Sequence, residues 1–357
     1  MTGHVLLYGA TGYTGRQIAR ALAAAGTPMV LAGRDPQAVA EVAQPLGLDG
    51  AAFTLDDTAR LDAALSGATV VLHAAGPYAE TAAPMLAACL RTRTHYLDLA
   101  GEWPVFADAQ RRDAAAREAG IMLMPGVGLT VVATDCLLAL AKQAQPDAVK
   151  LLLGVSKAQV ITRGTVASAA GLLGPGAIVR RGGRLVQVPA GSLACAFDFG
   201  DGLRETTAMS WADVVTGEHS TGVQDIEVYS ELPWYQRASY RSSGLAMAVT
   251  GAAPWRTAGK RLATVWPEGP AEEARGAAAF VMAVEALDPW RRPRRLRLRT
   301  LDGYTVSVLT AAAAAQRVLA GEWVAGFQTP SRVFGAEFIL GLGCAWLEGT
   351  PTSEVAA

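Results

Sequence analysis

Three glycines at intervals of three residues, Gly9, Gly12 and Gly15, stand between an apolar segment and an amphipathic one. Gly9 permits a tight turn, Gly12 lets backbone N–H groups approach a diphosphate, and Gly15 lets a helix pack close to a strand. The diphosphate then sits on the positive end of that helix. A strand is expected before this loop, and a helix and a ribose-binding residue are expected after it. The loop therefore predicts dinucleotide binding rather than a plain glycine-rich turn. The other residues of the loop expected to line the site are Thr11, Tyr13 and Thr14.

A second position bears on which dinucleotide is bound. Gly33 and Arg34 follow the apolar segment Met29–Ala32. An acidic residue directly after this strand would bind the ribose 2′-hydroxyl of NAD, whereas the planar guanidinium of an arginine accepts a 2′-phosphate. Asp35 fits instead as the cap of a helix that begins at Pro36, which leaves Arg34 for the phosphate. The sequence therefore favours NADP(H).

Small residues followed by a tyrosine end the fourth apolar segment. Ala74, Ala75 and Gly76 would leave space for ribose and nicotinamide, because ligands of open α/β sheets lie beyond the carboxyl ends of the strands. Pro77, which follows them, is also expected to line the cofactor site. Tyr78 would stand beside this space, where its phenol could donate a hydrogen bond or a proton. Packing of Tyr78 between domains is the alternative. His73, within the same segment, is expected to be buried with its ring hydrogen-bonded.

Two carboxylates follow the fifth apolar segment. Asp98 and Glu102 fall at the edge where cofactor and substrate should meet, so they could orient a substrate ammonium or hydroxyl group, or hold a catalytic water. The alternative is structural: Asp98 caps a loop, and Glu102 begins a helix whose dipole it stabilises. Both interpretations stay open.

Composition excludes several other classes of protein. The 357 residues carry a formal net charge of −1 and are 51% hydrophobic, so the chain has no overall field for nucleic acid or membranes. Its four cysteines include no Cys-x-x-Cys pair, which argues against a metal or redox site and favours a cytoplasmic protein. No signal-peptide pattern or bilayer-spanning segment is expected. No tyrosine is followed four residues later by lysine, so the proton-donor pair of short-chain dehydrogenases is missing.

Strand and helix patterns alternate through the first third of the chain. Continuous apolar runs that are each followed by a helix indicate a parallel sheet covered on both faces. Six such strands complete a doubly wound, Rossmann-type α/β domain. Strands are expected at His4–Tyr8, Met29–Ala32, Ala51–Leu55, Thr69–Ala74, His95–Leu99 and Ile121–Pro125, and helices at Arg16–Ala25, Pro36–Leu46, Thr58–Leu65, Ala83–Arg91 and Ala107–Ala119.

After Val131 the pattern changes to a helix, Val132–Gln143, and then to longer β-like segments, which predicts a second, α+β domain. Asp302-Gly303 has the sequence of a tight hairpin turn. A last apolar helix, Ser331–Leu347, is expected to return to the Rossmann domain. Strands are expected at Val149–Ser156, Leu185–Pro189, Ile226–Ser230, Ala277–Ala286, Arg295–Thr300 and Tyr304–Thr310. The predicted division is 1–130 for the nucleotide domain, 131–328 for the substrate domain and 329–357 for the C-terminal helix and tail.

Several short motifs are spread along nearly the whole chain. They are Gly9–Gly15, Ala32–Arg34, Ala75–Tyr78, His95–Glu102, Arg163–Thr165, Gly269–Arg275, Asp302–Tyr304 and Thr329–Pro330. In these motifs the chain resembles the saccharopine-dehydrogenase-like oxidoreductases, specifically the branch that includes the trans-acting enoyl reductases. The resemblance implies a Rossmann domain with an inserted α+β domain, a returning C-terminal helix and NADP(H) as cofactor. Because relatives act on imines and on conjugated C=C bonds alike, the substrate does not follow from it.

A dense basic run, Arg291–Arg299, gives one strand face a positive charge. It is interpreted either as a solvated strand face or as a dock for an acidic acyl carrier protein or a phosphorylated substrate. Two functions are considered for the whole chain. One is an NADPH-dependent reductase of a small molecule, with Tyr78 or an ordered water as proton donor; the other is a regulatory protein that senses NADP without turnover. A homodimer is compatible with either.

Overall fold

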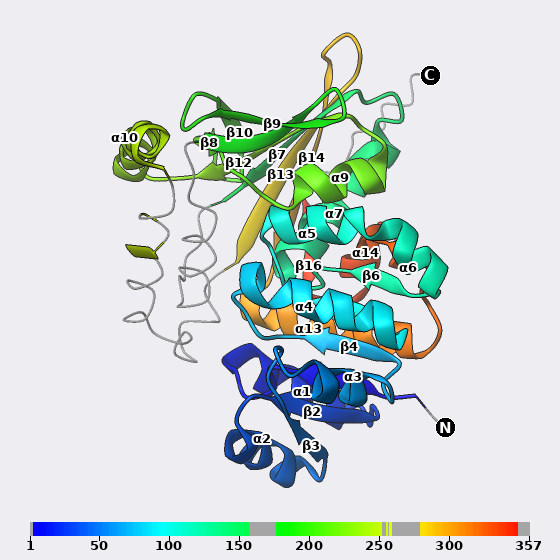
Figure 1. Ribbon diagram of the computed structural model, residues 1–357. Coiled ribbons are helices and arrows are strands. Elements are labelled where there is room, and N and C mark those ends of the chain that lie inside the picture. The colour runs from blue at the N-terminus through cyan, green and yellow to red at the C-terminus, as the bar shows by residue number, and fades with distance from the viewer. Residues whose placement is uncertain (1–2, 157–175, 252–254, 256, 259–278, 349–357) are drawn as a thin grey trace, which may run out of the picture.

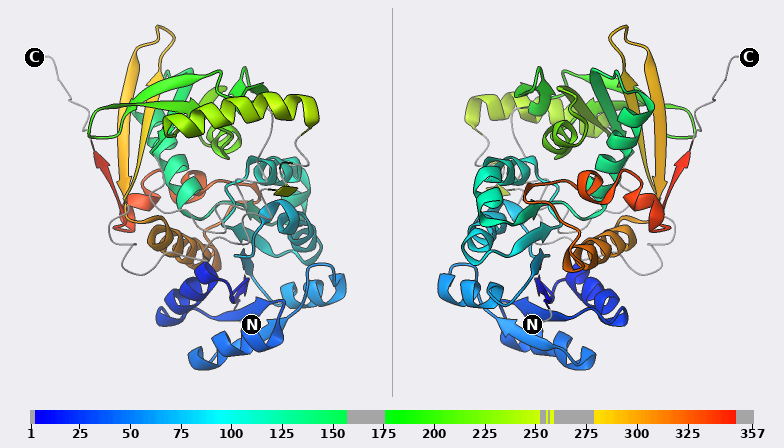
Figure 2. Two further views of the ribbon diagram at one scale, coloured as in Figure 1. Left: turned by 90° about the vertical axis from the view of Figure 1, so that its left-hand side faces the viewer. Right: turned by 90° about the vertical axis from the view of Figure 1, so that its right-hand side faces the viewer.

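The computed structural model describes residues 3–156, 176–251, 255, 257–258 and 279–348. These residues form two β-sheets at opposite ends of the molecule, with helices on and between them (Figure 1). The first sheet comes mainly from the N-terminal third of the chain. Figure 2 shows helix α13 (Gly303–Leu319) lying beside the N-terminal part, so a late segment of the chain returns to the first sheet.

The first sheet has seven described strands in the order β15-β6-β5-β4-β1-β2-β3, and all of its pairings are parallel. Its central strands are apolar runs buried along their whole length, as expected for strands covered on both faces. The doubly wound Rossmann-type fold is therefore confirmed. The strands are β1 Val5–Tyr8, β2 Met29–Gly33, β3 Asp49–Ala52, β4 Val70–His73, β5 His95–Asp98, β6 Met122–Met124 and β15 Gly326–Phe327.

The helices of this domain lie in two layers. The strand order moves one way from β1 to β3 and the other way from β4 to β6, so right-handed connections place the two sets of helices on opposite faces. Accordingly α1 packs beside α13, whereas α3, α4 and α5 pack against one another. The helices are α1 Tyr13–Ala24, α2 Pro36–Ala43, α3 Thr58–Leu65, α4 Tyr78–Thr92, α5 Trp103–Arg111 and α6 Asp113–Ala119, with a 3-10 turn at Gln44–Leu46.

The second sheet is mixed, with nine described strands, which confirms the α+β expectation. Its main order is β10-β11-β12-β7-β13-β14-β16, with β8 attached to β12 and β9 to β8; among the described strands, only β7 and β12 pair in parallel. The strands are β7 Lys150–Val155, β8 Gly176–Arg181, β9 Arg184–Pro189, β10 Ala194–Asp198, β11 Leu203–Ala208, β12 Asp225–Glu231, β13 Phe280–Leu287, β14 Pro293–Thr300 and β16 Ala345–Glu348.

Helix α7 (Leu129–Ala144) lies between the two sheets. Most of its residues are buried because apolar or small side chains cover nearly all of its circumference. It packs on α13 and also on α9 (Asp213–Thr221), β13 and β14, so one hydrophobic core continues from the first sheet to the second. Among the described residues, no helix, including α10 (Trp234–Thr250), is long and apolar enough to cross a membrane.

The predicted hairpin at Asp302-Gly303 is wrong. The Asp302 side chain accepts hydrogen bonds from the backbone N–H groups of Tyr304 (3.0 Å) and Thr305 (3.1 Å), so it caps the N-terminus of α13. A strand at Tyr304–Thr310 is thereby replaced by a helix, because an N-cap aspartate followed by an alanine-rich run favours helix. β14 forms its hairpin with the preceding strand, β13.

The predicted helix Ser331–Leu347 is also wrong. Gly335 (φ 92°) and Gly343 (φ 66°) adopt conformations that interrupt a helix. The segment instead forms two short helices, α14 (Pro330–Phe334) and α15 (Phe338–Gly341), which pack on α7, and then β16, which pairs with β14. The return to the Rossmann sheet is made by α13 and β15, which lie within the range assigned to the substrate domain.

Candidate active site

The glycine loop between β1 and α1 has the geometry of a diphosphate cradle. Gly9 has φ 88°, and a Cβ atom there would lie 2.7 Å from the backbone N of Ala75. A Cβ on Gly15 would clash with the carbonyl oxygen of Gly9, so the helix packs against the strand as closely as predicted. At Gly12, which is exposed, a Cβ would meet only the Gly9 oxygen, at 3.4 Å. The first intrahelical bond runs from Arg16 N to Gly12 O (2.9 Å), so the N–H groups of the first helical turn are not used within the helix. The loop therefore fits a dinucleotide diphosphate.

The ribose end of the site follows β2. Asp35 accepts hydrogen bonds from the backbone N–H groups of Gln37 (2.9 Å) and Ala38 (3.2 Å), which confirms that it caps α2. Arg34 is exposed at the carboxyl end of β2, and its charge acts on the neighbouring Tyr8 phenol, whose pKa burial otherwise raises. The position of Arg34 fits a 2′-phosphate, and its role in binding one stays a prediction.

The segment after β4 is held by a residue that the sequence did not single out. The hydroxyl of Thr81, in the first turn of α4, donates to the carbonyl oxygens of Ala75 (2.7 Å) and Pro77 (3.2 Å). The ring of Tyr78 packs beside the same segment, 3.6 Å from where a Cβ of Gly76 would stand. Ala75, Gly76 and Pro77 thus form a fixed loop next to the glycine cradle. A threonine in the first turn of a helix is a weak signal, because its partners depend on the loop's path.

Tyr78 lies at the end of β5 with the two predicted carboxylates. Its side chain is 9% exposed. Burial raises the pKa of Tyr78 well above its ordinary value, and the negative charges of Asp98 and Glu102 raise it further, against a backbone hydrogen bond from Leu99. The phenol therefore remains protonated and can act as a hydrogen-bond donor. The structure brings the three predicted catalytic residues together.

Asp98 is fully buried and makes three hydrogen bonds. Its Oδ1 accepts from the backbone N–H groups of Ala100 (2.8 Å) and Gly126 (2.7 Å), and its Oδ2 accepts from the hydroxyl of Tyr96 (2.5 Å). Burial raises the pKa of Asp98 to about 7 in spite of these bonds. Asp98 therefore joins the end of β5 to the loop after β6. This is the structural role, capping of a loop, that the sequence offered as the alternative to a catalytic one.

Glu102 also occupies the place that the structural alternative describes. It stands immediately before α5 at the N-cap position, is buried, and its Oε2 accepts a hydrogen bond from the N–H of Gly101 (2.9 Å). Asp98 and Glu102 thus shape the charge around Tyr78, and a direct contact of either with substrate stays a prediction.

His73, at the end of β4, is buried as expected, but its ring is not hydrogen-bonded. Neither nitrogen has a hydrogen-bond partner, so the expectation of a satisfied ring is wrong. Burial lowers the pKa of His73 to about 3, which keeps the imidazole neutral. Its ring lies among aromatic side chains, edge-to-face with Tyr78 at 5.5 Å between ring centroids.

The N-terminus of α13 supports the site from the other face of the sheet. Tyr304 packs edge-to-face on Tyr13 of the glycine loop, with ring centroids 5.1 Å apart. The Ser307 hydroxyl accepts from the N–H of Leu129 (3.1 Å), and the Thr310 hydroxyl donates to the carbonyl of Val127 (2.8 Å). These contacts were missed because the segment was interpreted as a hairpin, although Asp302 followed by a helix-favouring sequence is an N-cap signal.

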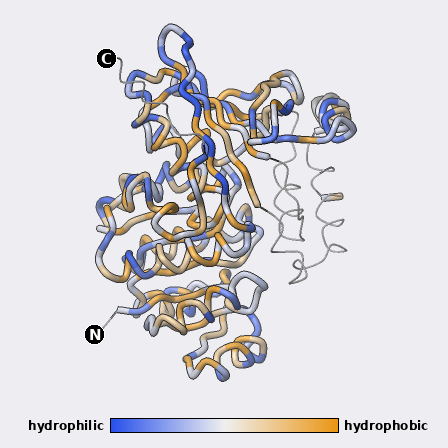
Figure 3. The backbone as a smooth tube through the Cα atoms, turned by 180° about the vertical axis from the view of Figure 1, so that it is seen from behind, coloured by the Kyte–Doolittle hydropathy of each residue, from blue (hydrophilic) through white to orange (hydrophobic). Residues whose placement is uncertain are grey.

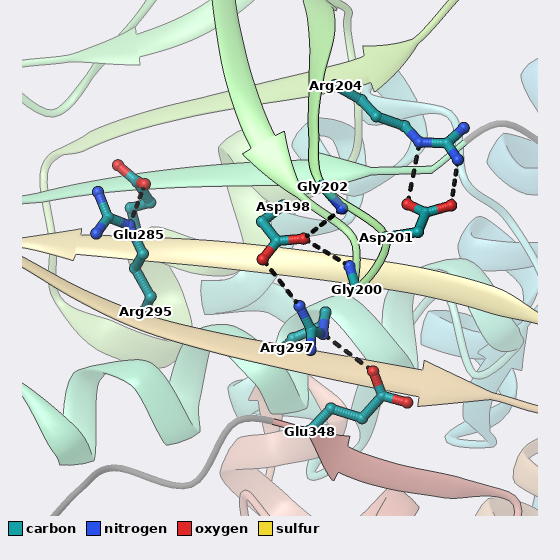
Figure 4. Close-up of polar contacts among 9 residues, drawn as sticks. All are labelled: Asp198, Gly200, Asp201, Gly202, Arg204, Glu285, Arg295, Arg297 and Glu348. Carbon is teal, nitrogen blue, oxygen red and sulfur yellow. Dashed lines mark hydrogen bonds and ion pairs between the residues drawn. The ribbon is translucent and has the colours of Figure 1, made fainter.

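Three arginines of the basic strand β14, Arg295, Arg297 and Arg299, have their charges paired within the chain. Arg295 pairs with Glu285 (2.6 Å), and Arg297 with Glu348 (3.0 Å) (Figure 4). Arg297 also pairs with Asp198 (3.4 Å), and Arg299 with Glu348. The tip of the β13–β14 hairpin is hydrophilic (Figure 3). This pairing favours the solvated strand face over a dock for an acidic partner. The motifs Arg163–Thr165 and Gly269–Arg275 lie outside the described residues.

This chain matches curated relatives over about a third of its length. It is 36% identical over 132 residues to the trans-acting enoyl reductase of Mycobacterium leprae, a match that covers 34% of this chain and 32% of that protein. It is 37% identical over 105 residues to the trans-acting enoyl reductase of Mycobacterium tuberculosis, covering 28% of this chain and 25% of that protein. The chain thus matches a third or less of the length of these relatives.

Solved structures share the whole fold. Saccharopine dehydrogenase (L-Glu forming) of Saccharomyces cerevisiae superposes with a TM-score of 0.62 at 13% identity, covering 97% of this chain and all of that one. Homospermidine synthase of Legionella pneumophila, solved with NAD, gives a TM-score of 0.62 at 10% identity, covering 100% and 94%. Residues 5–124 match the model of the saccharopine dehydrogenase NADP binding domain. Residues 5–124 of this chain are therefore similar to the NADP binding domain of saccharopine dehydrogenase.

Proposed function

We propose that the protein is an NADPH-dependent reductase that transfers hydride to a polarised double bond, an enoyl C=C first and an imine C=N second. The substrate is a mainly apolar small molecule or a carrier-linked intermediate. The observation that carries this proposal is the meeting of the glycine cradle, the loop Ala75–Pro77 and a protonated Tyr78 at one edge of the sheet. The names of the relatives, trans-acting enoyl reductases, support the order of the two bond types.

In this proposal the cofactor lies across the carboxyl ends of the strands. The loop at Gly12 receives the diphosphate, Arg34 binds the 2′-phosphate, and Ala75 and Gly76 leave room for the nicotinamide. When bound, NADPH supplies the hydride. The protein's contribution is to hold the acceptor bond close to the cofactor and to exclude water.

The second requirement is a proton or a hydrogen bond for the charge that develops on the substrate. Hydride addition to a conjugated C=C leaves negative charge on the carbonyl oxygen, where a donor stabilises it. Tyr78 remains protonated over the working range of pH because it is buried and faces Asp98 and Glu102. The same charges make a free phenolate unfavourable. Tyr78 therefore passes its proton to the substrate and takes up another from water, or an ordered water protonates the substrate directly.

The test follows NADPH oxidation by absorbance with a panel of enones, enoyl thioesters and cyclic imines. The proposal expects turnover that depends on the cradle, so a Gly12→Val variant should show none. NADPH binding without turnover of either bond type would overturn it and would leave the non-catalytic NADP sensor. A measurable rate with imines but not with enoyl compounds would reverse the proposed order of substrates.

A further inference from the structure

His73 occupies a central place at the carboxyl edge of the first sheet. In the strand register it stands between Tyr8 of β1 and Asp98 of β5, so these three side chains point to the same face of the sheet. The imidazole is completely buried, and neither nitrogen has a hydrogen-bond partner. Buried polar groups without partners cost stability, and each one calls for an explanation.

Three aromatic rings surround this imidazole. Tyr78 meets it at an interplanar angle of 84° with ring centroids 5.5 Å apart, the edge-to-face arrangement that attracts aromatic pairs. Tyr8 lies at 5.5 Å and Tyr96 at 6.3 Å, both tilted. Because Tyr8 and Tyr96 belong to neighbouring strands, they fix the imidazole, and the imidazole then contacts Tyr78, which belongs to α4.

Tyr78 is the first residue of α4, where a helix end has fewer neighbours to hold a side chain. The loop at Gly76 borders its ring on one side, 3.6 Å from the position of a Cβ, and His73 contacts it as well. A rigid contact of this kind matters for a donor, since a displacement of about 1 Å costs up to about a hundredfold in rate.

We propose that His73 is a positioning residue for Tyr78, and that the packing of its ring, rather than its nitrogens, holds the phenol toward Asp98 and the substrate. The proposal rests on the proposed function in that it assigns the proton-donating role to Tyr78. A neutral imidazole suits this role because it adds no charge beside the phenol. The unpartnered nitrogens are then a stability cost that an apolar aromatic ring would remove.

The test compares His73→Phe, which keeps a ring, with His73→Leu, which keeps only apolar volume. His73→Phe should retain the wild-type kcat and melt at a higher temperature. His73→Leu should lower kcat by about tenfold to a hundredfold with an unchanged Kd for NADPH. A His73→Phe variant as slow as His73→Leu would show that the nitrogens are needed, and an unimpaired His73→Leu would show that no positioning occurs; either result overturns the proposal.

A second measurement does not depend on turnover. Ultraviolet titration of His73→Leu against the double variant His73→Leu/Tyr78→Phe isolates the Tyr78 phenol. Once displaced from the carboxylates, this phenol should titrate nearer its ordinary pKa of about 10 than it does in the wild type. The same titration in wild type and His73→Leu would overturn the proposal. If the wild type reduces no substrate at all, the proposed function fails, whereas this titration still decides whether His73 holds the ring.

Discussion

The carboxylate of Asp98 accepts a hydrogen bond of 2.7 Å from the backbone N–H of Gly126, which joins the end of β5 to the loop that leads into α7. Gly126 itself has φ 79°, and a Cβ there would lie 2.6 Å from the ring of Phe106. The loop thus has one path, and Asp98 holds it. Val127 and Leu129, which follow Gly126, are hydrogen-bonded to side chains of α13. The hydrogen bond from Asp98 and the contacts from α13 therefore hold the same stretch of chain.

Loss of this carboxylate should destabilise the fold. Asp98→Ala leaves three buried donors without an acceptor, from Tyr96, Ala100 and Gly126, so we expect the free energy of unfolding to fall by about 2–4 kcal/mol. Asp98→Asn keeps one carbonyl oxygen as an acceptor and should lose less. Urea denaturation measures both, with the partly exposed Asp108→Ala as control. Equal stability of Asp98→Ala and Asp108→Ala would contradict the role given to Asp98.

A buried carboxylate on α9 should make stability depend on pH. Burial, the main cause, and the negative charge of Asp135 together raise the pKa of Asp213 to about 7. An aspartate in the unfolded chain has a pKa of about 3.9, so between these values the folded state binds more protons and stability falls as pH rises.

The variant Asp213→Asn removes this titration. It should gain stability relative to the wild type as pH rises from about 4 to about 7, with a limit of about 4 kcal/mol, and the difference should level off above that range. Thermal or urea unfolding of both proteins at several pH values measures the effect. Two stability curves that remain parallel over this range would show that Asp213 is not the group responsible.

Arg34 should set the cofactor preference. We expect NADPH to bind at least about tenfold more tightly than NADH, which requires only about 1.4 kcal/mol from a charge-assisted contact. Arg34→Ala should remove most of that difference. The adjacent Asp35→Ala is a matched control, because it should cost α2 its cap, about 1 kcal/mol, and leave the cofactor ratio unchanged. Equal Kd values for the two cofactors in the wild type would refute this assignment.

The two glycines of the cradle should respond differently to a side chain. Gly12→Val should abolish NADPH binding while the protein stays folded, because a Cβ there meets only the Gly9 oxygen and points into open space. Gly15→Ala should destabilise the fold, since its Cβ would clash with the backbone of the same strand end. Calorimetric titration and thermal unfolding separate these effects. Retained NADPH affinity in Gly12→Val would place the diphosphate elsewhere.

Several parts of the site that the sequence predicts correctly are local ones. The strand, loop and helix around Gly9–Gly15 lie within about 20 consecutive residues, and their apolar spacing and glycines indicate each element in turn. The cap at Asp35 depends on N–H groups only two and three residues away. In such cases neighbouring residues carry all the information that the geometry needs.

The parts that it does not predict depend on distant residues or on ambiguous signals. Asp98 and Gly126 are 28 residues apart, and Tyr13 meets Tyr304 from the far end of the chain, so no local pattern indicates either contact. Asp302-Gly303 fits a hairpin turn and a helix N-cap equally well, and only the following residues distinguish them. That His73 is buried follows from its apolar strand, but the missing partners of its ring depend on three tyrosines from other segments.

In the proposed function the phenol of Tyr78 donates a hydrogen bond or a proton to the substrate during hydride transfer. The variant Tyr78→Phe tests this role most directly. It removes the hydroxyl and keeps the ring that packs against Gly76 and His73. With an enoyl substrate that the wild type reduces, kcat should fall by about 10²–10⁴-fold while the Kd for NADPH stays nearly unchanged. A Tyr78→Phe enzyme that turns over at the wild-type rate would contradict the account and would leave Tyr78 as a packing residue.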